Sequence, residues 1–327
     1  NLIADDVPAG KDENENKVIR KWGEPAKFGF KPRDHVELGE ALDIIDLKNA
    51  AEVVGARFAY LKGDAALLEF ALVQFVMESL TSRKTLKEIA GDYDSKPFIP
   101  VVPPVMIKEE VFARMGRLHT KYDRVHIRTD DLWLIGSAEH TLGPLHMDEV
   151  LNEKDLPIRY VGFSTSFRRE AGSYGKDTRG ILRVHQFDKV EMESFTTPEN
   201  GLREQDFMVA IQEYLMQHLE IPYQVISICT GDMGAPDFRQ IDIEAWLPGQ
   251  DKYRETHTSD YMTDYQSRRL NTKVARKGET ELVHMNDATA FAIGRTIIAI
   301  LENNQQKDGS VRIPKVLQKY MGKDTIR

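Results

Sequence analysis

The chain has 327 residues, of which 41% are hydrophobic and 29% are charged, and its formal net charge is −8. This composition is typical of a globular protein with one large or two modest domains. The acidic balance argues against a protein that binds nucleic acid over its whole surface. No apolar run reaches the ~18 residues of a membrane-spanning helix, and no basic-then-apolar leader is present. The single cysteine, Cys229, excludes an intramolecular disulfide. We therefore expect a cytoplasmic protein without membrane contacts.

The first third of the chain predicts a polar lead-in followed by a helix and a bent strand. Residues 1–35 are polar and irregular, so we expect an extended lead-in segment there and a folded domain over residues 36–327. Residues 64–82 carry apolar side chains at helical spacing, and Asp64 is the expected N-cap. Residues 95–112 begin as a strand, which Pro103 and Pro104 must bend or place at an edge, because proline cannot donate to a ladder.

The rest of the chain alternates between runs of strands and single helices. The predicted elements are, in chain order, a strand at 132–136 followed by a helix start, strands at 159–167 and 185–195, a helix at 201–220, strands at 224–229, 240–247 and 281–285, and a helix at 288–304. The strands follow one another without a repeated β–α–β rhythm. The pattern therefore predicts the α+β class, with a mostly antiparallel sheet flanked by helices.

A glycine-containing charged loop joins the strands at 159–167 and 185–195. The stretch 167–191 reads FRREAGSYGKDTRGILRVHQFDKVE. The loop does not match the phosphate-binding pattern GxxxxGK[ST], because Glu170 stands at the first glycine and Asp177 at the hydroxyl position. No GxGxxG follows a strand either. A nucleotide bound here would therefore be held by side chains.

The returning strand places an aromatic ring and an acid on one face. Residues two apart on a strand share a face, so Phe187, Lys189 and Glu191 point the same way. Phe187 and Glu191 lie about 13 Å apart at ~3.3 Å per residue, which is roughly the reach from a purine across a phosphate to a small acyl group. The forked donors of Arg168 suit phosphate oxygens. The same pattern also fits a solvated hairpin with ordinary surface charges.

These residues resemble a known family. FRREAGSYGKDTRG followed by RVHQFDKVE resembles motif 2 of class II aminoacyl-tRNA synthetases, in the form found in seryl-tRNA synthetases. GSAEHTLGPLH resembles the Thr-Ala-Glu serine-binding segment of that family, and PVVPPVMIKEEV resembles motif 1. Further segments stand in the family's order, namely WGEPAKFGFKPRDHVELGEAL, CTGDMG, WLPGQDKYRE, DYQSRR and AFAIGRTIIAILENNQQKDGSVRIPKVLQKYM. The resemblance runs from about residue 5 to residue 322.

The resemblance implies an ATP site with Mg²⁺. Arg168 would hold the α-phosphate, Arg183 the outer phosphates, and Glu170 the adenine end. Adenine would stack between Phe187 and Arg295. The implied ATP-binding residues are Arg168, Arg169, Glu170, Arg183, Phe187, Glu255, Thr256, His257, Thr258 and Arg295. Of these, the implied catalytic residues are Arg168, Arg183, Glu255 and Arg295, and the implied Mg²⁺ ligands are Glu255 and Thr258.

The resemblance also implies the substrates and the partners. L-serine would be activated with ATP to seryl-adenylate and then transferred to the 3′ end of tRNA(Ser), by a homodimer with motif 1 at its two-fold interface. The implied serine-binding residues are Ser137, Ala138, Glu139, Arg168, Glu191 and Thr289.

The chain departs from the family pattern in three places. Asp287, Ala288 and Thr289 stand where Asn-Gly-Ser is usual, so Asp287 adds a negative charge near the amino-acid pocket. Thr256-His257-Thr258 stands where the family has two serines after the glutamate, and Ser137 replaces a threonine.

The heptads of the family's N-terminal coiled-coil arm do not occur in this chain. We therefore expect serine activation to persist and tRNA binding to be weak. Two other interpretations stay open: a serine-activating paralogue that loads a carrier protein, and a non-catalytic dimeric binding module.

Overall fold

An eight-stranded sheet forms the centre of the structure. The structure is a computed structural model and describes residues 2–118, 123–170 and 179–327. The strand order is β1-β11-β12-β13-β16-β10-β9-β4, and every neighbouring pair is antiparallel except β4 with β9. The strands span Lys17–Trp22 (β1), Tyr223–Ser227 (β11), Arg239–Leu247 (β12), Lys252–Thr263 (β13), His284–Ala292 (β16), Gln186–Thr196 (β10), Ile158–Phe167 (β9) and Ile99–Val101 (β4). The predicted α+β class with a mostly antiparallel sheet is confirmed.

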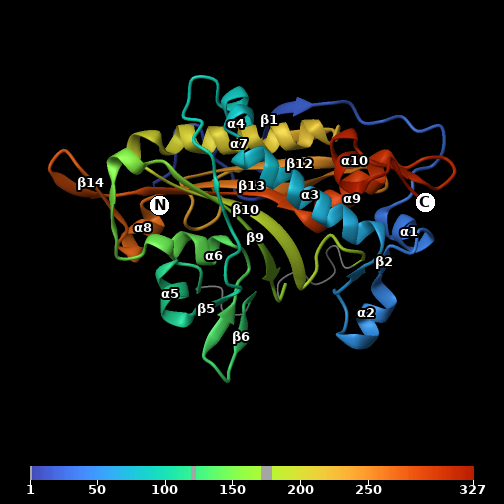
Figure 1. The fold of residues 1–327 in the computed structure, drawn as a ribbon, viewed down its shortest axis with the longest axis horizontal. Helices are drawn as coiled ribbons and strands as arrows, with labels where there is room; N and C mark the ends of the chain where they lie inside the picture. The colour runs from blue at the N-terminus through green and yellow to red at the C-terminus, as the bar shows by residue number, and fades with distance from the viewer. Residues whose placement is uncertain (1, 119–122, 171–178) are drawn as a thin grey trace.

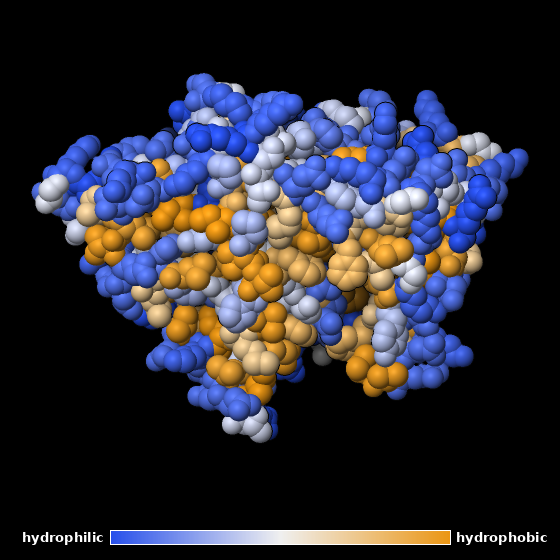
Figure 2. All heavy atoms as spheres, viewed as in Figure 1, coloured by the Kyte–Doolittle hydropathy of each residue, from blue (hydrophilic) through white to orange (hydrophobic). Residues whose placement is uncertain are grey.

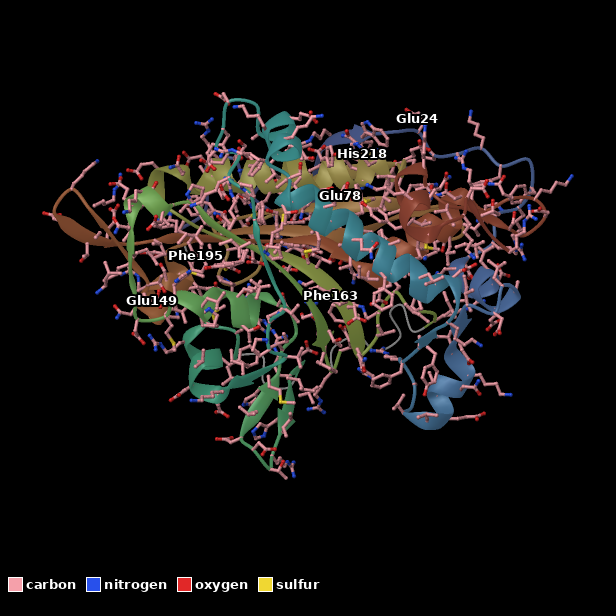
Figure 3. All side chains as sticks on the ribbon, viewed as in Figure 1. Glu24, Glu78, Glu149, Phe163, Phe195 and His218 are labelled. Carbon is pink, nitrogen blue, oxygen red and sulfur yellow. The ribbon has the colours of Figure 1, made fainter. Side chains whose placement is uncertain are left out.

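Three long helices cover one face of this sheet (Figure 1). They are α3 (Asp64–Thr81), α7 (Gly201–His218) and α9 (Ile293–Asn304). Phe207, Ile211 and Leu215 of α7 recur every four residues and are buried in the main core, because this spacing directs them to one side of a helix. In Figure 3, Glu78 and His218 mark the helical layer, and Phe163 and Phe195 mark the strands below it. The helices thus leave the opposite face of the sheet to other segments.

Shorter elements surround the sheet. The remaining helices and turns are η1 (Glu13–Glu15), α1 (His35–Ala41), α2 (Leu47–Val53), α4 (Arg83–Ala90), α5 (Glu109–Arg114), α6 (Glu139–Leu142), η3 (Gly143–His146), η4 (Glu153–Asp155), η5 (Pro198–Asn200), α8 (Tyr265–Leu270) and α10 (Lys315–Met321). The remaining strands are β2 (Ile45–Asp46), β3 (Tyr60–Leu61), β5 (Met106–Lys108), β6 (Val125–Ile127), β7 (Leu132–Leu134), β8 (Val150–Asn152), β14 (Lys273–Arg276), β15 (Glu279–Leu282), β17 (Val311–Arg312) and β18 (Thr325–Ile326). In Figure 1, α5 and α6 lie near one end of the sheet's other side, and α2 lies near the other end.

Two sequence expectations about helices were wrong. Residues 288–292, expected in a helix, form the end of β16, because they pair with β10 in the sheet and Ala288 also pairs with Ser259 of β13. Only Ile293–Asn304 is helical. Asp64 does not cap α3: Gly63 holds the cap position, and the carboxylate of Asp64 forms an ion pair with Lys323 instead.

Several strands differ from what the sequence predicted. Residues 281–285 belong to two strands, β15 and β16, which are separated at Val283. The whole of β13 was missed. The lead-in expected to be irregular contains β1, whose residues Lys17–Trp22 pair with β11 at the edge of the large sheet. All six residues of β1 are exposed, so no alternation of buried and exposed residues marks this strand.

Within the described residues, no single helix is both long and apolar enough to cross a membrane. Only α3 and α4 taken together would meet these requirements, and they meet at a bend of 75°.

A buried ion pair joins the sheet to its helical layer. Arg159 of β9 is 1% exposed and Glu204 of α7 is fully buried. The Arg159 Nε and Nη2 atoms donate to the two Glu204 carboxylate oxygens at 2.6 and 2.8 Å. The hydroxyl groups of Ser194 and Tyr93 donate to the same carboxylate at 2.7 and 2.8 Å. Both carboxylate oxygens of Glu204 are thus satisfied, and Glu204 is the buried counter-charge of a guanidinium whose other carboxylate partner, Asp94 at 3.0 Å, is half exposed.

We predict that Glu204→Gln destabilises the fold by about 3–5 kcal/mol, because the buried guanidinium of Arg159 would then keep only the half-exposed Asp94 as a counter-charge. The free energy of unfolding in urea measures this loss. The control is Asp92→Asn, which removes the partner of Arg203 in an exposed ion pair and should cost less than about 1 kcal/mol. Equal losses in the two variants would contradict the role given to the buried pair.

Candidate active site

A cavity lies beside β10, β13 and β16, and its other walls come from residues 117, 124, 137, 139 and 140 and from residues 168, 170 and 181–184. The antiparallel register determines which side chains lie at the cavity floor and which lie next to it. Glu191 lies opposite Thr289, and Asp287 lies between Glu193 and Asp260. Residues far apart in the sequence are therefore neighbours on one face of the sheet.

Most of the predicted site residues line this cavity. Those at its wall are Ser137, Glu139, Arg168, Glu170, Arg183, Phe187, Glu255, Thr256, Thr258, Thr289 and Arg295. They come from seven separate stretches of sequence. The fold therefore gathers into one place the residues that the motif resemblance had selected separately.

Three arginines occupy the outer part of the cavity, and each makes a defined contact. The Arg168 guanidinium lies 5.2 Å from the centre of the Phe187 ring, and its Nε donates to the Gly136 carbonyl at 3.2 Å. Arg183 Nη1 lies 2.8 Å from Glu170 Oε2. These contacts hold the forked donors beside an aromatic face, an arrangement suited to a planar base with a phosphate next to it.

Arg295 and Glu255 form a second ion pair at the cavity wall. Arg295 Nη1 donates to Glu255 Oε1 and to the Glu255 backbone carbonyl, both at 2.9 Å. Partial burial would raise the pKa of Glu255, but the positive charges of Arg295, Arg168 and Arg183 outweigh it and hold the pKa below its ordinary value. Glu255 is therefore an ionised oxygen donor at the cavity.

The inner part of the cavity holds Ser137, Glu139 and Thr289, all of them more than nine-tenths buried. Glu139 Oε1 accepts from Arg117 Nε at 2.9 Å and from Gln266 Nε2 at 2.7 Å. Burial alone would raise the pKa of Glu139, yet the Arg117 charge and these hydrogen bonds lower it. The inner end thus offers an ionised carboxylate next to hydroxyl groups.

Four predicted residues do not line the cavity. Ala138 is fully buried at the start of α6, and Arg169 is exposed, with its backbone N–H donating to the Asp123 carbonyl. His257 is buried beside Phe291, its Nδ1 lies 2.8 Å from Thr256 Oγ1, and burial lowers its pKa to about 4. Glu191 is 1% exposed and lies behind Lys189, whose Nζ is 2.6 Å from its carboxylate.

The cavity also contains charged residues to which the sequence analysis assigned no role: Arg117, Arg124, Lys189, Asp260 and Asp287. Lys189 lies two residues from Phe187, and Asp260 two residues from Thr258, so strand periodicity could have identified both. Arg117 and Arg124 stand in a stretch without a motif, and no sequence signal pointed to them. Residues 171–178, which include the loop that failed the phosphate-binding pattern, lie outside the described residues.

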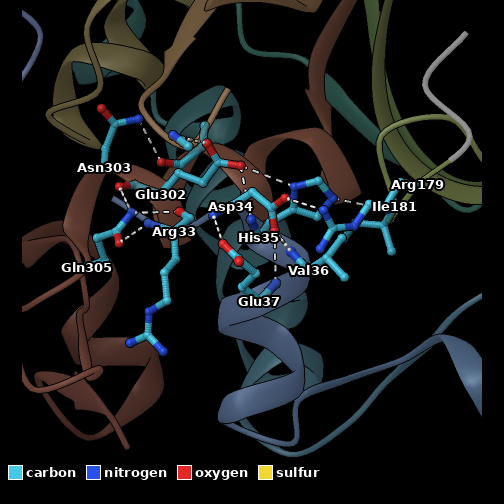
Figure 4. Close-up of polar contacts among 12 residues, drawn as sticks. Arg33, Asp34, His35, Val36, Glu37, Arg179, Ile181, Glu302, Asn303 and Gln305 are labelled. Carbon is cyan, nitrogen blue, oxygen red and sulfur yellow. Dashed lines mark hydrogen bonds and ion pairs between the residues drawn. The ribbon is translucent and has the colours of Figure 1, made fainter. Parts of the chain in front are cut away.

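The lead-in segment positions one wall of the cavity. The Ile181 backbone N–H donates to His35 Nε2 at 3.3 Å, and Ile181 lines the cavity. Since Nε2 accepts this bond, Nδ1 of His35 carries the proton and donates to Glu302 Oε1 at 3.1 Å. Arg179 pairs with Asp34 at 3.2 Å next to this contact. Figure 4 shows the chain of contacts from Glu302 through His35 to Ile181.

A buried carboxyl group behind the cavity makes stability depend on pH. Asp237 is 2% exposed, and burial raises its pKa to about 6, although Arg117 opposes the shift. The folded state therefore holds this proton more tightly than the unfolded state. Its contribution to stability is complete below the unfolded pKa of about 4 and is lost as the pH rises through 6.

We predict that Asp237→Asn raises the free energy of unfolding by about 1–3 kcal/mol at pH 8, because an amide carries no buried charge there. At pH 4 the two proteins should be equally stable within about 0.5 kcal/mol. Urea unfolding at both pH values measures the difference. A variant that is less stable than the parent at pH 8 would contradict the assignment.

Comparisons with known proteins agree with this geometry. The family model for the class II tRNA synthetase core domain (G, H, P, S and T) matches residues 122–304. The chain is 43% identical to a serine–tRNA ligase of Thermodesulfovibrio yellowstonii and 46% identical to one of Acidothermus cellulolyticus. In both cases the match covers 100% of this chain and 75% of the relative.

Solved structures give the same result. The crystal structure of seryl-tRNA synthetase from Pyrococcus horikoshii complexed with ATP superimposes with a TM-score of 0.92 at 41% identity, over 100% of this chain and 75% of that one. The cytoplasmic serine–tRNA ligase of Naegleria fowleri in complex with AMP gives 0.91 at 32% identity, over 99% and 75%. The chain belongs to the class II aminoacyl-tRNA synthetases and, within them, to the serine–tRNA ligases.

Proposed function

We propose that the cavity is where this member of the family forms seryl-adenylate from L-serine and ATP and then transfers the seryl group to the 3′ end of tRNA(Ser). The observation that carries this proposal is the convergence of Arg168, Glu170, Phe187, Glu255 and Arg295 on one cavity. Two related structures were obtained with ATP and with AMP, which supports a nucleotide in the corresponding place.

The outer part of the cavity is proposed to hold the nucleotide. The purine stacks on Phe187, and Arg168, which already lies over that ring, reaches the α-phosphate beside it. Arg183 binds the outer phosphates and Arg295 stacks on the other face of the purine, once their carboxylate partners, Glu170 and Glu255, turn to the ligand. In this arrangement the arginines stabilise negative charge as it develops on the α-phosphate.

The inner part is proposed to hold serine. The ionised carboxylate of Glu139 binds the α-ammonium group, and the hydroxyl groups of Ser137 and Thr289 lie at the same end. Glu191 acts through Lys189, which separates its carboxylate from the cavity. The carboxylate of serine then attacks the α-phosphate, and pyrophosphate leaves in line. No protein nucleophile is required, because the attacking oxygen belongs to the substrate.

The residues present suit a magnesium ion. Glu255 carries an ionised carboxylate at the cavity wall, and Thr258 adds a hydroxyl oxygen three residues along the same strand. Hard oxygen donors of this kind are what Mg²⁺ prefers. When bound, the ion would neutralise charge on the phosphate oxygens. Glu255 and Thr258 are the residues that would hold it.

The domain boundaries and the cellular location are also part of the proposal. Residues 36–327 form the catalytic domain, and residues 1–35 extend it through β1 and through the backbone contact that Arg33 makes with Gln305 at 2.8 Å. Since ATP and tRNA meet in the cytoplasm during translation, we place the reaction there.

We predict that the purified chain catalyses ATP–pyrophosphate exchange that depends on L-serine. L-alanine should not replace L-serine, because without a substrate hydroxyl group the polar groups of the serine pocket would be left unpaired. Arg168→Ala should lower this exchange by about 10²–10³-fold, since it removes a donor aimed at developing charge. Arg203→Ala, at an exposed ion pair, is the matched control and should retain the parent rate.

Exchange without serine dependence, or an Arg168→Ala variant as active as Arg203→Ala, would refute the site. Exchange that proceeds normally, followed by transfer to a carrier protein and not to tRNA, would refute the choice of acceptor alone.

An exposed apolar surface supports a homodimer. Leu67 and Phe70 on the outer side of α3 are 51% and 59% exposed, and Ile99, Val102 and Met106 around the motif-1 prolines are 49%, 88% and 46% exposed. Figure 2 shows apolar residues gathered across the middle of this face, below a polar upper edge. Exposed apolar side chains in one area mark interaction surfaces. We propose that two copies of the chain associate through this surface.

We predict a dimer in sedimentation velocity experiments, and we expect Phe70→Glu together with Val102→Glu to shift it to monomer, because buried unpaired carboxylates oppose association. Leu202→Glu, at an exposed apolar residue on α7, should leave the dimer intact. A parent chain that sediments as a monomer at micromolar concentration would contradict the proposal.

A further inference from the structure

Two carboxyl groups at the inner end of the cavity have no part in the proposed reaction. Asp287 and Asp260 both line the cavity, and they are 5% and 8% exposed. The Oδ1 atom of each is buried and accepts no hydrogen bond from the described residues. A buried carboxylate without donors is costly, so such atoms call for a ligand or a proton.

The sheet register places these groups in a row. Asp287 lies directly opposite Asp260 on one side and directly opposite Glu193 on the other. Side chains directly opposite each other on antiparallel strands have Cβ atoms about 4.5–5.5 Å apart, and like charges in such pairs are unfavourable. Glu193 is fully buried, and neither of its carboxyl oxygens has a hydrogen-bond partner among the described residues.

One guanidinium group faces this row. Arg117 Nη2 lies 3.9 Å from Asp287 Oδ1, which is beyond hydrogen-bond distance. The same Arg117 already contacts Glu139 with Nε and Nη2 at 2.9 and 2.7 Å. Its charge is therefore committed mainly to Glu139, so Asp287 has this guanidinium only at 3.9 Å, and Asp260 forms no ion pair within the described residues.

The row lies just beyond the proposed serine position. Asp287 is two residues from Thr289 on the same strand, so the two side chains share a face and their Cα atoms lie about 7 Å apart. Glu139, the proposed partner of the α-ammonium group, belongs to the same cavity. An amino acid bound there would have its side chain directed to Thr289 and the two aspartates.

We propose that this end of the cavity also accepts an amino acid whose side chain carries an ammonium group, with L-2,3-diaminopropionate as the smallest example, and that Asp287 and Asp260 bind that group. The proposal rests on the adenylate-forming function proposed above for the same cavity. The hydroxyl of serine donates one hydrogen bond, whereas an ammonium group of nearly the same size donates three and carries a positive charge. It therefore matches two unpartnered carboxyl groups without requiring more space.

The test is ATP–pyrophosphate exchange by the full chain with L-2,3-diaminopropionate, L-serine and L-alanine, at a pH where the side-chain amine is protonated. We expect kcat/KM for L-2,3-diaminopropionate to exceed that for L-alanine by about 100-fold, the range for hydrogen bonds to a charged group. Exchange with L-2,3-diaminopropionate no faster than with L-alanine, while serine is used, would overturn this proposal alone. Absence of exchange with serine would instead count against the proposed function.

Isosteric variants test the residues. Asp287→Asn and Asp260→Asn should each lower the ratio of L-2,3-diaminopropionate to L-serine exchange by about 10-fold or more. Glu193→Gln is the matched control, since Glu193 belongs to the same row but does not line the cavity, and it should leave the ratio unchanged. If circular dichroism shows that one aspartate variant does not fold, the exchange ratio of the other variant still tests the proposal. Ratios that fall equally in all three variants would overturn direct binding by the aspartates.

Discussion

The antiparallel register of three central strands is the constraint on which the rest of the site depends. Because β16 lies between β13 and β10, Thr289 faces Glu191, and Asp287 faces both Glu193 and Asp260. A shift by one residue in either pairing would turn these side chains to the helical face, where α7 and α9 pack. The chemistry of the cavity is therefore secured by backbone hydrogen bonds, and the helices that bury the opposite face keep the register in place.

The site concentrates charge that is unfavourable without a ligand. At the outer end, Arg183 and Arg295 form ion pairs with Glu170 and Glu255, so the charges of these arginines are neutralised until a nucleotide replaces their partners. At the inner end, carboxyl groups outnumber cations, and burial raises the pKa of Asp287 well above its ordinary value. The cavity is thus polarised. Arginine side chains lie at the end where the nucleotide would bind, and an excess of carboxyl groups lies at the end where an ammonium group would bind.

The sequence predicted the parts of this site that carry local patterns. The strands around motif 2 were placed within one residue, because Phe187 and Glu191 mark an alternating face. The strand β13 was missed because its polar residues face the cavity and leave no apolar period. Residues 288–292 were assigned to a helix because alanines suit a helix, whereas pairing with β10 imposed a strand. Arg117 reaches Glu139 and Asp287 only through tertiary structure, so no motif marked it.

The account's central claim is that one cavity holds a purine at Phe187 and an amino acid at Glu139 and Thr289. A crystal structure of the chain with a non-hydrolysable seryl-adenylate analogue tests this most directly. The account predicts the adenine ring stacked on Phe187 and the α-ammonium group within hydrogen-bond distance of Glu139. An analogue bound with its base away from the Phe187 ring, or with its amino group at the outer arginines, would contradict the account.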